Sequence, residues 1–185
     1  IKDAIAYELA RGGQVYFLSP RITKMPFLRD NIARLFPKAA RSLLHGRMPE
    51  SQIMRTMHDF REGKIQILIS TTIIENGLDI SRANTLIVDD AVKLGLPQAH
   101  QLRGRIGRGT EKAHAYFLYS SKYLTPKAEE RLEALLDFQL HQHIGNAGAL
   151  VLKLLVVPNP VIDLGERSVV VGHELEVLAL DGIIL

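Results

Sequence analysis

Short apolar runs that alternate with amphipathic segments of helical length constrain the fold of this chain more than any other feature. Val15–Leu18 and Thr85–Val88 are continuous apolar or β-branched runs, the pattern of a strand buried on both faces. In residues 27–36 and 50–62, apolar positions recur three and four residues apart, which is typical of an amphipathic helix. Strands separated by helices of this length predict βαβ units around a parallel sheet.

The same pattern predicts the other elements. We expect a first helix that Gly12 and Gly13 stop, and a long helix with Thr125 as N-cap and Pro126 in its first turn, running to about Leu140. Further strands are expected at 42–44, 65–69 and 113–119, and a further helix at 102–108. The predicted fold class is therefore α/β, a three-layer lobe with a mainly parallel sheet flanked by helices.

Composition narrows the class of protein. The chain has 185 residues, of which 46% are hydrophobic and 23% charged, so it suits a globular domain and argues against wholesale disorder. It has no cysteine, which excludes disulfides, thiolate metal sites and a cysteine nucleophile. No apolar stretch reaches the ~18–20 residues of a membrane span, and no signal-peptide pattern is present, so we expect a cytoplasmic protein. The net charge of +3 permits an anionic partner.

The pattern changes after His143. Residues 147–157 are apolar, prolines then interrupt the run, and only short apolar runs follow. We therefore expect a lobe over residues 1–143 and an extension over 144–185 that packs on this lobe or on a missing part. Because the chain begins with Ile1 rather than Met, we expect it to be a fragment of a longer protein.

Residues 101–108 form the segment that points most directly to chemistry. Arg105 and Arg108 are three positions apart and so share a helix face, while the neighbouring glycines permit close approach of a ligand. The planar, permanently charged guanidinium suits a transferring phosphoryl group. A solvated basic helix would explain most arginine pairs, but the shared register of glycines and arginines here favours a catalytic site.

A second candidate site follows the strand at 65–69. Thr71 and Thr72 end this strand, and the loop after them carries Gly77 and Asp79. Because the carboxyl ends of parallel strands form the ligand edge of a sheet, the hydroxyls are placed to hold a nucleic-acid phosphate and Asp79 to accept from a ribose hydroxyl. Taken alone, the segment is more typical of a strand end followed by a turn; the arginine segment downstream strengthens the functional interpretation.

His45, Gly46 and Arg47 form a third candidate, a turn directly after the strand at 42–44. A phosphate contact and an ordinary exposed turn fit this turn about equally well. The chain has neither a G-x-x-x-x-G-K-[ST] loop nor an acidic box for Mg²⁺, and its histidines do not have metal-ligand spacing, so no metal site is predicted.

In this order and spacing, the three segments resemble motifs IVa, V and VI of superfamily 2 helicases and translocases. The resemblance implies the second RecA-like lobe, which is the lobe without a Walker loop. Further runs resemble the bacterial transcription-repair coupling factors, with the RecG fork helicases as near relatives. The matching runs are residues 11–18, 71–75, 83–85, 95–98, 101–108 and 115–119, and the resemblance is collinear from about residue 1 to 136.

The resemblance implies an ATP-dependent translocase on double-stranded DNA that displaces stalled RNA polymerase and recruits excision-repair proteins. ATP and Mg²⁺ would be bound mainly by a first lobe absent from this chain, so the chain would not hydrolyse ATP alone. Arg105 and Arg108 would reach the ATP phosphates, with Arg108 as the arginine finger, and Gln101 would couple the nucleotide to DNA. Gly77 and Asp79 would border the nucleotide. The DNA backbone contacts would be His45, Gly46, Arg47, Thr71 and Thr72.

The chain departs from the coupling factors at two places. Asp89 and Asp90 stand where that family has a basic or acidic-arginine pair, and a translocation motif of the form G-x-G-F…R-D-L-E-I-R-G is absent after the long helix. The alternatives are therefore a RecG-type fork helicase lobe and a non-catalytic DNA-binding lobe. A dinucleotide-binding domain is disfavoured, because residues 19–21 after the first strand are Ser-Pro-Arg and not a G-x-G-x-x-G loop.

Overall fold

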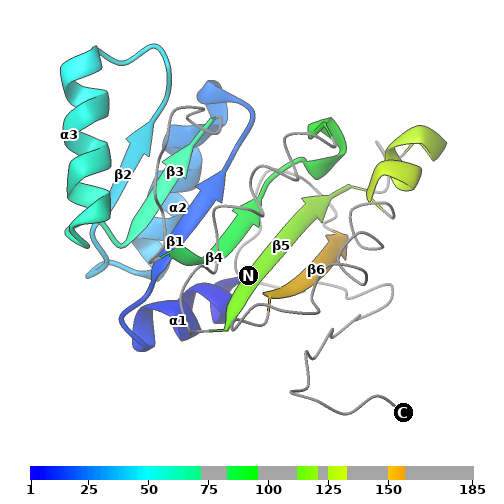
Figure 1. Ribbon diagram of the computed structural model, residues 1–185, viewed down its shortest axis with the longest axis horizontal. Coiled ribbons are helices and arrows are strands. Elements are labelled where there is room, and N and C mark those ends of the chain that lie inside the picture. Colours follow the sequence, from blue (N-terminus) through cyan, green and yellow to red (C-terminus); the bar gives the residue numbers. More distant parts are fainter. Residues whose placement is uncertain (72–82, 96–111, 121–124, 133–149, 157–185) are drawn as a thin grey trace.

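The computed structural model describes residues 1–71, 83–95, 112–120, 125–132 and 150–156. Within these residues, six strands form one sheet in the order β2-β3-β1-β4-β5-β6 (Figure 1). Every neighbouring pair is parallel. The strands are β1 (Gln14–Leu18), β2 (Arg41–Leu44), β3 (Ile67–Ser70), β4 (Ala83–Val88), β5 (Ala113–Tyr119) and β6 (Leu150–Val156).

Helices cover both faces of the sheet. They are α1 (Lys2–Ala10), α2 (Met25–Leu35) and α3 (Glu50–Arg61), with the 3-10 turns η1 (Ile22–Lys24) and η2 (Ala91–Lys93). Ile5 of α1 and Leu28 of α2 join one hydrophobic cluster, whereas Phe60 of α3 joins a second cluster. The described elements therefore form three layers, which confirms the predicted α/β class.

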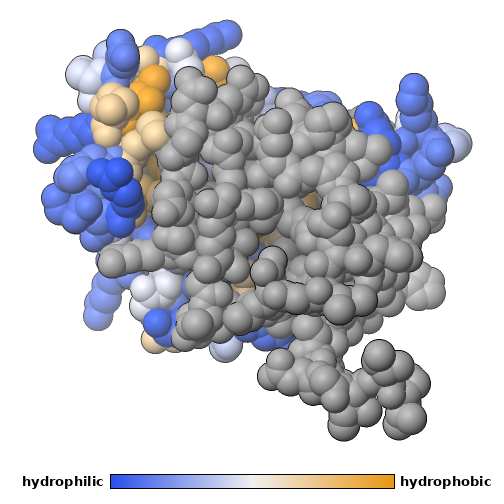
Figure 2. Space-filling model, in the orientation of Figure 1, coloured by the Kyte–Doolittle hydropathy of each residue, from blue (hydrophilic) through white to orange (hydrophobic). Residues whose placement is uncertain are grey.

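The central strands are buried at every position, as their continuous apolar sequences predict. Along β1, Val15 and Phe17 face the layer of α1 and α2, and Tyr16 and Leu18 face the layer of α3. At the surface, a narrow apolar strip lies beside α3 among mostly hydrophilic side chains (Figure 2). None of the described helices is both long enough and apolar enough to cross a lipid bilayer.

One predicted helix is confirmed in part, and one strand adds to the predicted outline. Residues 126–132 are helical, and the backbone N–H of Ala128 donates to Thr125 Oγ1 at 3.2 Å, so the predicted N-cap is confirmed. Strand β6 comes from the segment that we expected to be an extension, and it pairs with β5 from Ala113↔Leu150 to Tyr119↔Val156. The predicted helix at 102–108 lies outside the described residues.

The chain leaves β1 and β4 in opposite directions across the sheet. From β1 it passes to β2 and β3 on one side, then crosses to β4 on the other side of β1 and continues to β5. In open parallel sheets, ligands bind outside the carboxyl ends of the strands at such a switch point. The carboxyl edge around β1 and β4 is therefore where the fold itself favours a binding site.

Candidate nucleic-acid interface

The carboxyl edge of the sheet brings together segments that are far apart in the sequence. His45 directly follows β2 and Thr71 directly follows β3. Leu44 and Ser70, the last residues of these two strands, are register partners, and the N–H of Thr71 donates to Leu44 O at 3.3 Å. Two of the predicted DNA-contact segments therefore lie next to each other on neighbouring strands.

A tight turn presents His45, Gly46 and Arg47. The N–H of Met48 donates to His45 O at 3.0 Å and closes this turn. Gly46 and Arg47 are exposed, and a Cβ added to Gly46 would meet no atom within 4 Å. His45 is half-buried, and its Nδ1 is buried without a hydrogen-bond partner in the described part of the chain. Such unpaired buried atoms are rare in proteins.

Asp90 binds two basic side chains at the carboxyl end of β4. Its Oδ2 accepts from Arg21 Nη2 at 2.6 Å and from Lys93 Nζ at 2.8 Å. The residue adopts left-handed backbone angles, φ 55° and ψ 47°, which aspartate tolerates better than most residues. Burial alone would raise the pKa of Asp90, but the bonds from Lys93 and Arg21 outweigh it and hold the pKa below its usual value.

Asp89, its neighbour, is held more weakly. Its Oδ2 accepts from Ser19 Oγ at 3.2 Å and lies 3.9 Å from Lys24 Nζ, and its N–H donates to Leu18 O at 2.8 Å. Burial raises the pKa of Asp89 above its usual value, because the charge of Lys24 and the hydroxyl of Ser19 offset only part of the loss of hydration.

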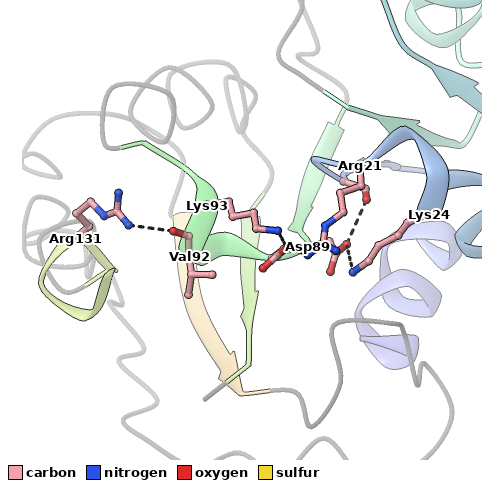
Figure 3. A network of polar contacts seen from close by, with 8 residues as sticks. Arg21, Lys24, Asp89, Val92, Lys93 and Arg131 are labelled. Atoms are coloured by element: carbon pink, nitrogen blue, oxygen red, sulfur yellow. Dashed lines mark hydrogen bonds and ion pairs between the residues drawn. The ribbon is translucent and has the colours of Figure 1, made fainter. Parts of the chain in front are cut away.

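Arg131 joins the helix after Thr125 to this edge of the sheet. Its Nη2 donates to Val92 O of η2 at 3.0 Å (Figure 3). Its Nε is buried and has no hydrogen-bond partner among the residues that the structure describes. The bond fixes η2, and with it the backbone next to Lys93.

The predicted nucleotide residues and one predicted DNA contact are not part of this geometry. The nucleotide residues Gly77, Asp79, Gln101, Arg105 and Arg108, and the DNA contact Thr72, all lie outside the described residues. Sequence reasoning did not select Arg21, Lys24 or Lys93, because no motif contains them. The one sequence signal for this group of charged residues was the pair Asp89 and Asp90, which departs from the coupling-factor pattern. Across the described ranges, no three His, Cys, Asp or Glu side chains gather as metal ligands.

A helicase family matches this chain, and curated transcription-repair-coupling factors are similar to it over three quarters of its length. The family described as "Helicase conserved C-terminal domain" matches residues 1–110. The Transcription-repair-coupling factor of Bacillus subtilis (strain 168) is 50% identical over 139 residues, which are 75% of this chain and 12% of that protein. The same factor from Borreliella burgdorferi is 47% identical over 139 residues, with the same two coverages. The chain thus spans only 12% of the length of these relatives.

Solved structures give the same fold. A structure of RecG bound to a three-way DNA junction is 34% identical with a TM-score of 0.64, and the match covers 72% of this chain and 18% of RecG. The Mss116p DEAD-box helicase domain 2, bound to an RNA duplex, has a TM-score of 0.60 at 13% identity and covers 82% of this chain and 58% of its own. At that identity the second likeness shows the fold alone.

Proposed function

The chain belongs to the family of helicase conserved C-terminal domains, and on this premise we propose that it is the second motor lobe of an ATP-dependent double-stranded DNA translocase. The observation that carries the proposal is 50% identity to a transcription-repair-coupling factor over three quarters of the chain. The full protein would displace stalled RNA polymerase and recruit excision-repair proteins in the cytoplasm.

In this proposal ATP is the substrate, and a first lobe holds it together with Mg²⁺. This chain has no G-x-x-x-x-G-K-[ST] loop, so it does not hydrolyse ATP alone. Arg105 and Arg108 reach the ATP phosphates across the cleft between the lobes, and Arg108 stabilises the charge of the transferring phosphoryl group. Gln101 couples the nucleotide to DNA, and Gly77 and Asp79 border the nucleotide. These roles come from the motif resemblance.

DNA runs along the carboxyl edge of the sheet in this proposal. Arg47 is exposed in the turn after β2, and Thr71 directly follows the neighbouring strand β3. A cationic side chain, backbone N–H groups and a hydroxyl at one edge suit contacts to phosphates, which position a protein on DNA without reading its sequence.

A chimaera tests the motor assignment. The matching 139-residue stretch of the Bacillus subtilis factor is replaced by the corresponding residues of this chain, and DNA-stimulated ATP hydrolysis is measured. We expect stimulated turnover, and we expect Arg108→Ala to lower kcat by about 10³-fold or more, as for other arginine fingers. Undiminished turnover in this variant would remove the finger assignment.

Arg55→Ala is the matched control in the same chimaera. The Arg55 side chain is 85% exposed on α3, and its nearest carboxylate is Asp59 at 3.9 Å. The substitution removes the same charge from a helix surface that the proposal does not use. Turnover should therefore remain within about twofold, because surface substitutions of this kind are close to neutral.

A non-catalytic DNA-binding lobe is the second candidate, because the sequence lacks the translocation motif after the predicted long helix. The whole chain, fused behind the first lobe of the Bacillus subtilis factor, separates the two. DNA binding with no DNA-stimulated ATP hydrolysis would favour the second candidate. A RecG-type lobe is favoured instead if an active fusion reverses DNA forks but does not displace stalled RNA polymerase.

A further inference from the structure

The switch point of the sheet is surrounded by five charged residues, which we call the switch-point cluster: Arg21, Lys24, Asp89, Asp90 and Lys93. Figure 3 labels Arg21, Lys24, Asp89 and Lys93 of this cluster. They come from the segments after β1 and β4, where the topology favours a ligand. No residue of the cluster was assigned to a ligand by the motif resemblance.

We propose that Arg21 and Lys93 form a second phosphate-binding site, which takes a backbone phosphate of double-stranded DNA. The inference rests on the proposed function, because that function supplies DNA as the ligand. It extends the DNA path beyond the turn after β2 to the ends of β1 and β4.

The buried position of the carboxylates and the exposed position of the cations in the switch-point cluster favour binding of an anion. Both carboxylates are buried, with side chains 2% exposed, whereas the side chains of Arg21 and Lys93 are 42% and 49% exposed. Three cations and two carboxylates leave one net positive charge. The negative charge therefore lies beneath the surface and the positive charge faces solvent, where a phosphate would approach.

Asp90 also holds the two cations in position for a ligand. Its Oδ2 binds both of them, so two long side chains are fixed before DNA arrives. Fixing such side chains in advance lowers the entropic cost of binding. The bond to Asp90 takes one of the five N–H donors of the guanidinium, and an ammonium has three donors, so each cation is able to bind a phosphate oxygen as well.

The spacing along the sheet edge fits a DNA backbone. Strand β4 lies three strand positions from β2, which at about 4.8 Å per strand is about 14 Å. Successive phosphates of one DNA strand rise about 3.4 Å along the helix axis, so about four steps span this distance. One DNA strand can therefore contact Arg47 and the switch-point cluster together.

The test is the salt dependence of duplex binding by the full chain. A fluorescent duplex of arbitrary sequence is titrated between about 50 and 200 mM salt, and the logarithm of the affinity is plotted against that of the salt concentration. We expect Arg21→Gln and Lys93→Gln each to lower affinity several-fold and to reduce the slope by about 0.9, the value for one lost phosphate contact. Each single variant leaves Asp90 with one cationic partner, so the fold is preserved.

Three further variants make the result interpretable. Arg21→Lys keeps the positive charge and a donor to Asp90, so the slope of its salt dependence should equal that of the unsubstituted chain. If Arg21 acted only through the structure of its guanidinium fork, lysine would not restore this slope. Lys64→Gln removes a cation paired with Asp59 at 3.4 Å before the start of β3, at the opposite edge of the sheet, and should leave the slope unchanged. Arg47→Gln reports the DNA contact of the proposed function itself.

The outcomes separate the two proposals. If Arg47→Gln reduces the slope while Arg21→Gln and Lys93→Gln behave like Lys64→Gln, the second phosphate site is wrong and the proposed function stands. Absence of duplex binding by the unsubstituted chain at low salt contradicts the DNA contacts of the proposed function, and this inference with them. Equal loss of slope in Lys64→Gln would show a diffuse charge effect and overturn the site.

Discussion

Asp89 and Asp90 are adjacent, and the side chain of each is 2% exposed, yet their pKa values shift in opposite directions. Both lose hydration on burial, which raises a carboxyl pKa. Asp90 regains more than it loses through two charged hydrogen bonds, whereas Asp89 has one hydroxyl and a more distant ammonium. Contact distance, and not burial, therefore decides which carboxylate stabilises the fold at neutral pH.

Replacing each aspartate by the isosteric asparagine separates the contributions of Asp89 and Asp90 to the free energy of unfolding. The folded-state pKa of Asp90 is below its ordinary value of 3.8, so its contribution to stability is present above pH 3.8 and is lost as the pH falls. The pKa of Asp89 is above 3.8, so ionisation of this group costs stability as the pH rises from 3.8. We expect Asp90→Asn to lower the free energy of unfolding at neutral pH by about 1–2 kcal/mol, between the values for exposed and buried pairs.

Urea unfolding between about pH 3 and 7 checks these signs. Relative to the parent chain, Asp90→Asn should become less stable as the pH rises through the carboxyl range, and Asp89→Asn should become more stable. Parallel pH profiles for the two variants would contradict the assignment of Arg21 and Lys93 to Asp90.

The candidate site shows which residues a sequence can identify. The turn at His45 and the hydroxyl at Thr71 were predictable, because residues that follow parallel strands meet at one edge. The bond between Arg21 and Asp90 was not, since it joins residues 69 positions apart and depends on β1 and β4 being neighbours. No local pattern carries the order of strands.

At the scale of elements, the two consecutive glycines that follow helix α1 have different structural roles. Gly12 has φ +76°, a conformation that glycine adopts readily, and its N–H donates to Leu9 O at 3.1 Å as the helix ends. Gly13 provides space instead, because a Cβ there would collide with the carboxylate of Glu8. The sequence predicted the stop but not this division.

Glu8 explains why the space matters. It is fully buried, and its Oε2 accepts from Thr85 Oγ1 and from Arg11 Nη2, each at 2.6 Å. Arg11 also donates to Lys112 O at 2.8 Å, so this network fixes α1 against β4 and the start of β5. A displaced carboxylate would deprive the buried hydroxyl of Thr85 of this acceptor, which is costly.

We therefore expect Gly13→Ala to lower the free energy of unfolding by about 1–3 kcal/mol, as overpacking does in other cores. Gly46→Ala is the matched control, because its Cβ would meet nothing within 4 Å and its φ is not positive. Chemical denaturation of both variants measures the difference. Equal stability of the two variants would show that Glu8 moves aside without cost.

At the scale of the molecule, the three-layer α/β class followed from the sequence because buried parallel strands are apolar throughout. The predicted bounds of the strand at 113–119 agree with β5. The place of residues 150–156 in the sheet was not predictable from the sequence, because a single apolar run fits an edge strand and a packed extension equally well. The structure adds this run to the sheet as β6, beside β5 and parallel to it.

The contribution of β6 bears on where the lobe ends, which we predicted at residue 143. Seven register pairs join β6 to β5, and without β6 the backbone of β5 would become an exposed edge of the sheet. For a chain that ends at residue 143, we expect the free energy of unfolding to be at least about 1 kcal/mol lower than for the full chain. This corresponds to a fall in Tm of about 2–4 °C or more. A chain that ends at residue 156 keeps β6 and is the control. If thermal unfolding gives the two truncated chains the same Tm, β6 adds no stability and the lobe ends where we predicted; if only the shorter chain is destabilised, β6 is an integral strand of the lobe.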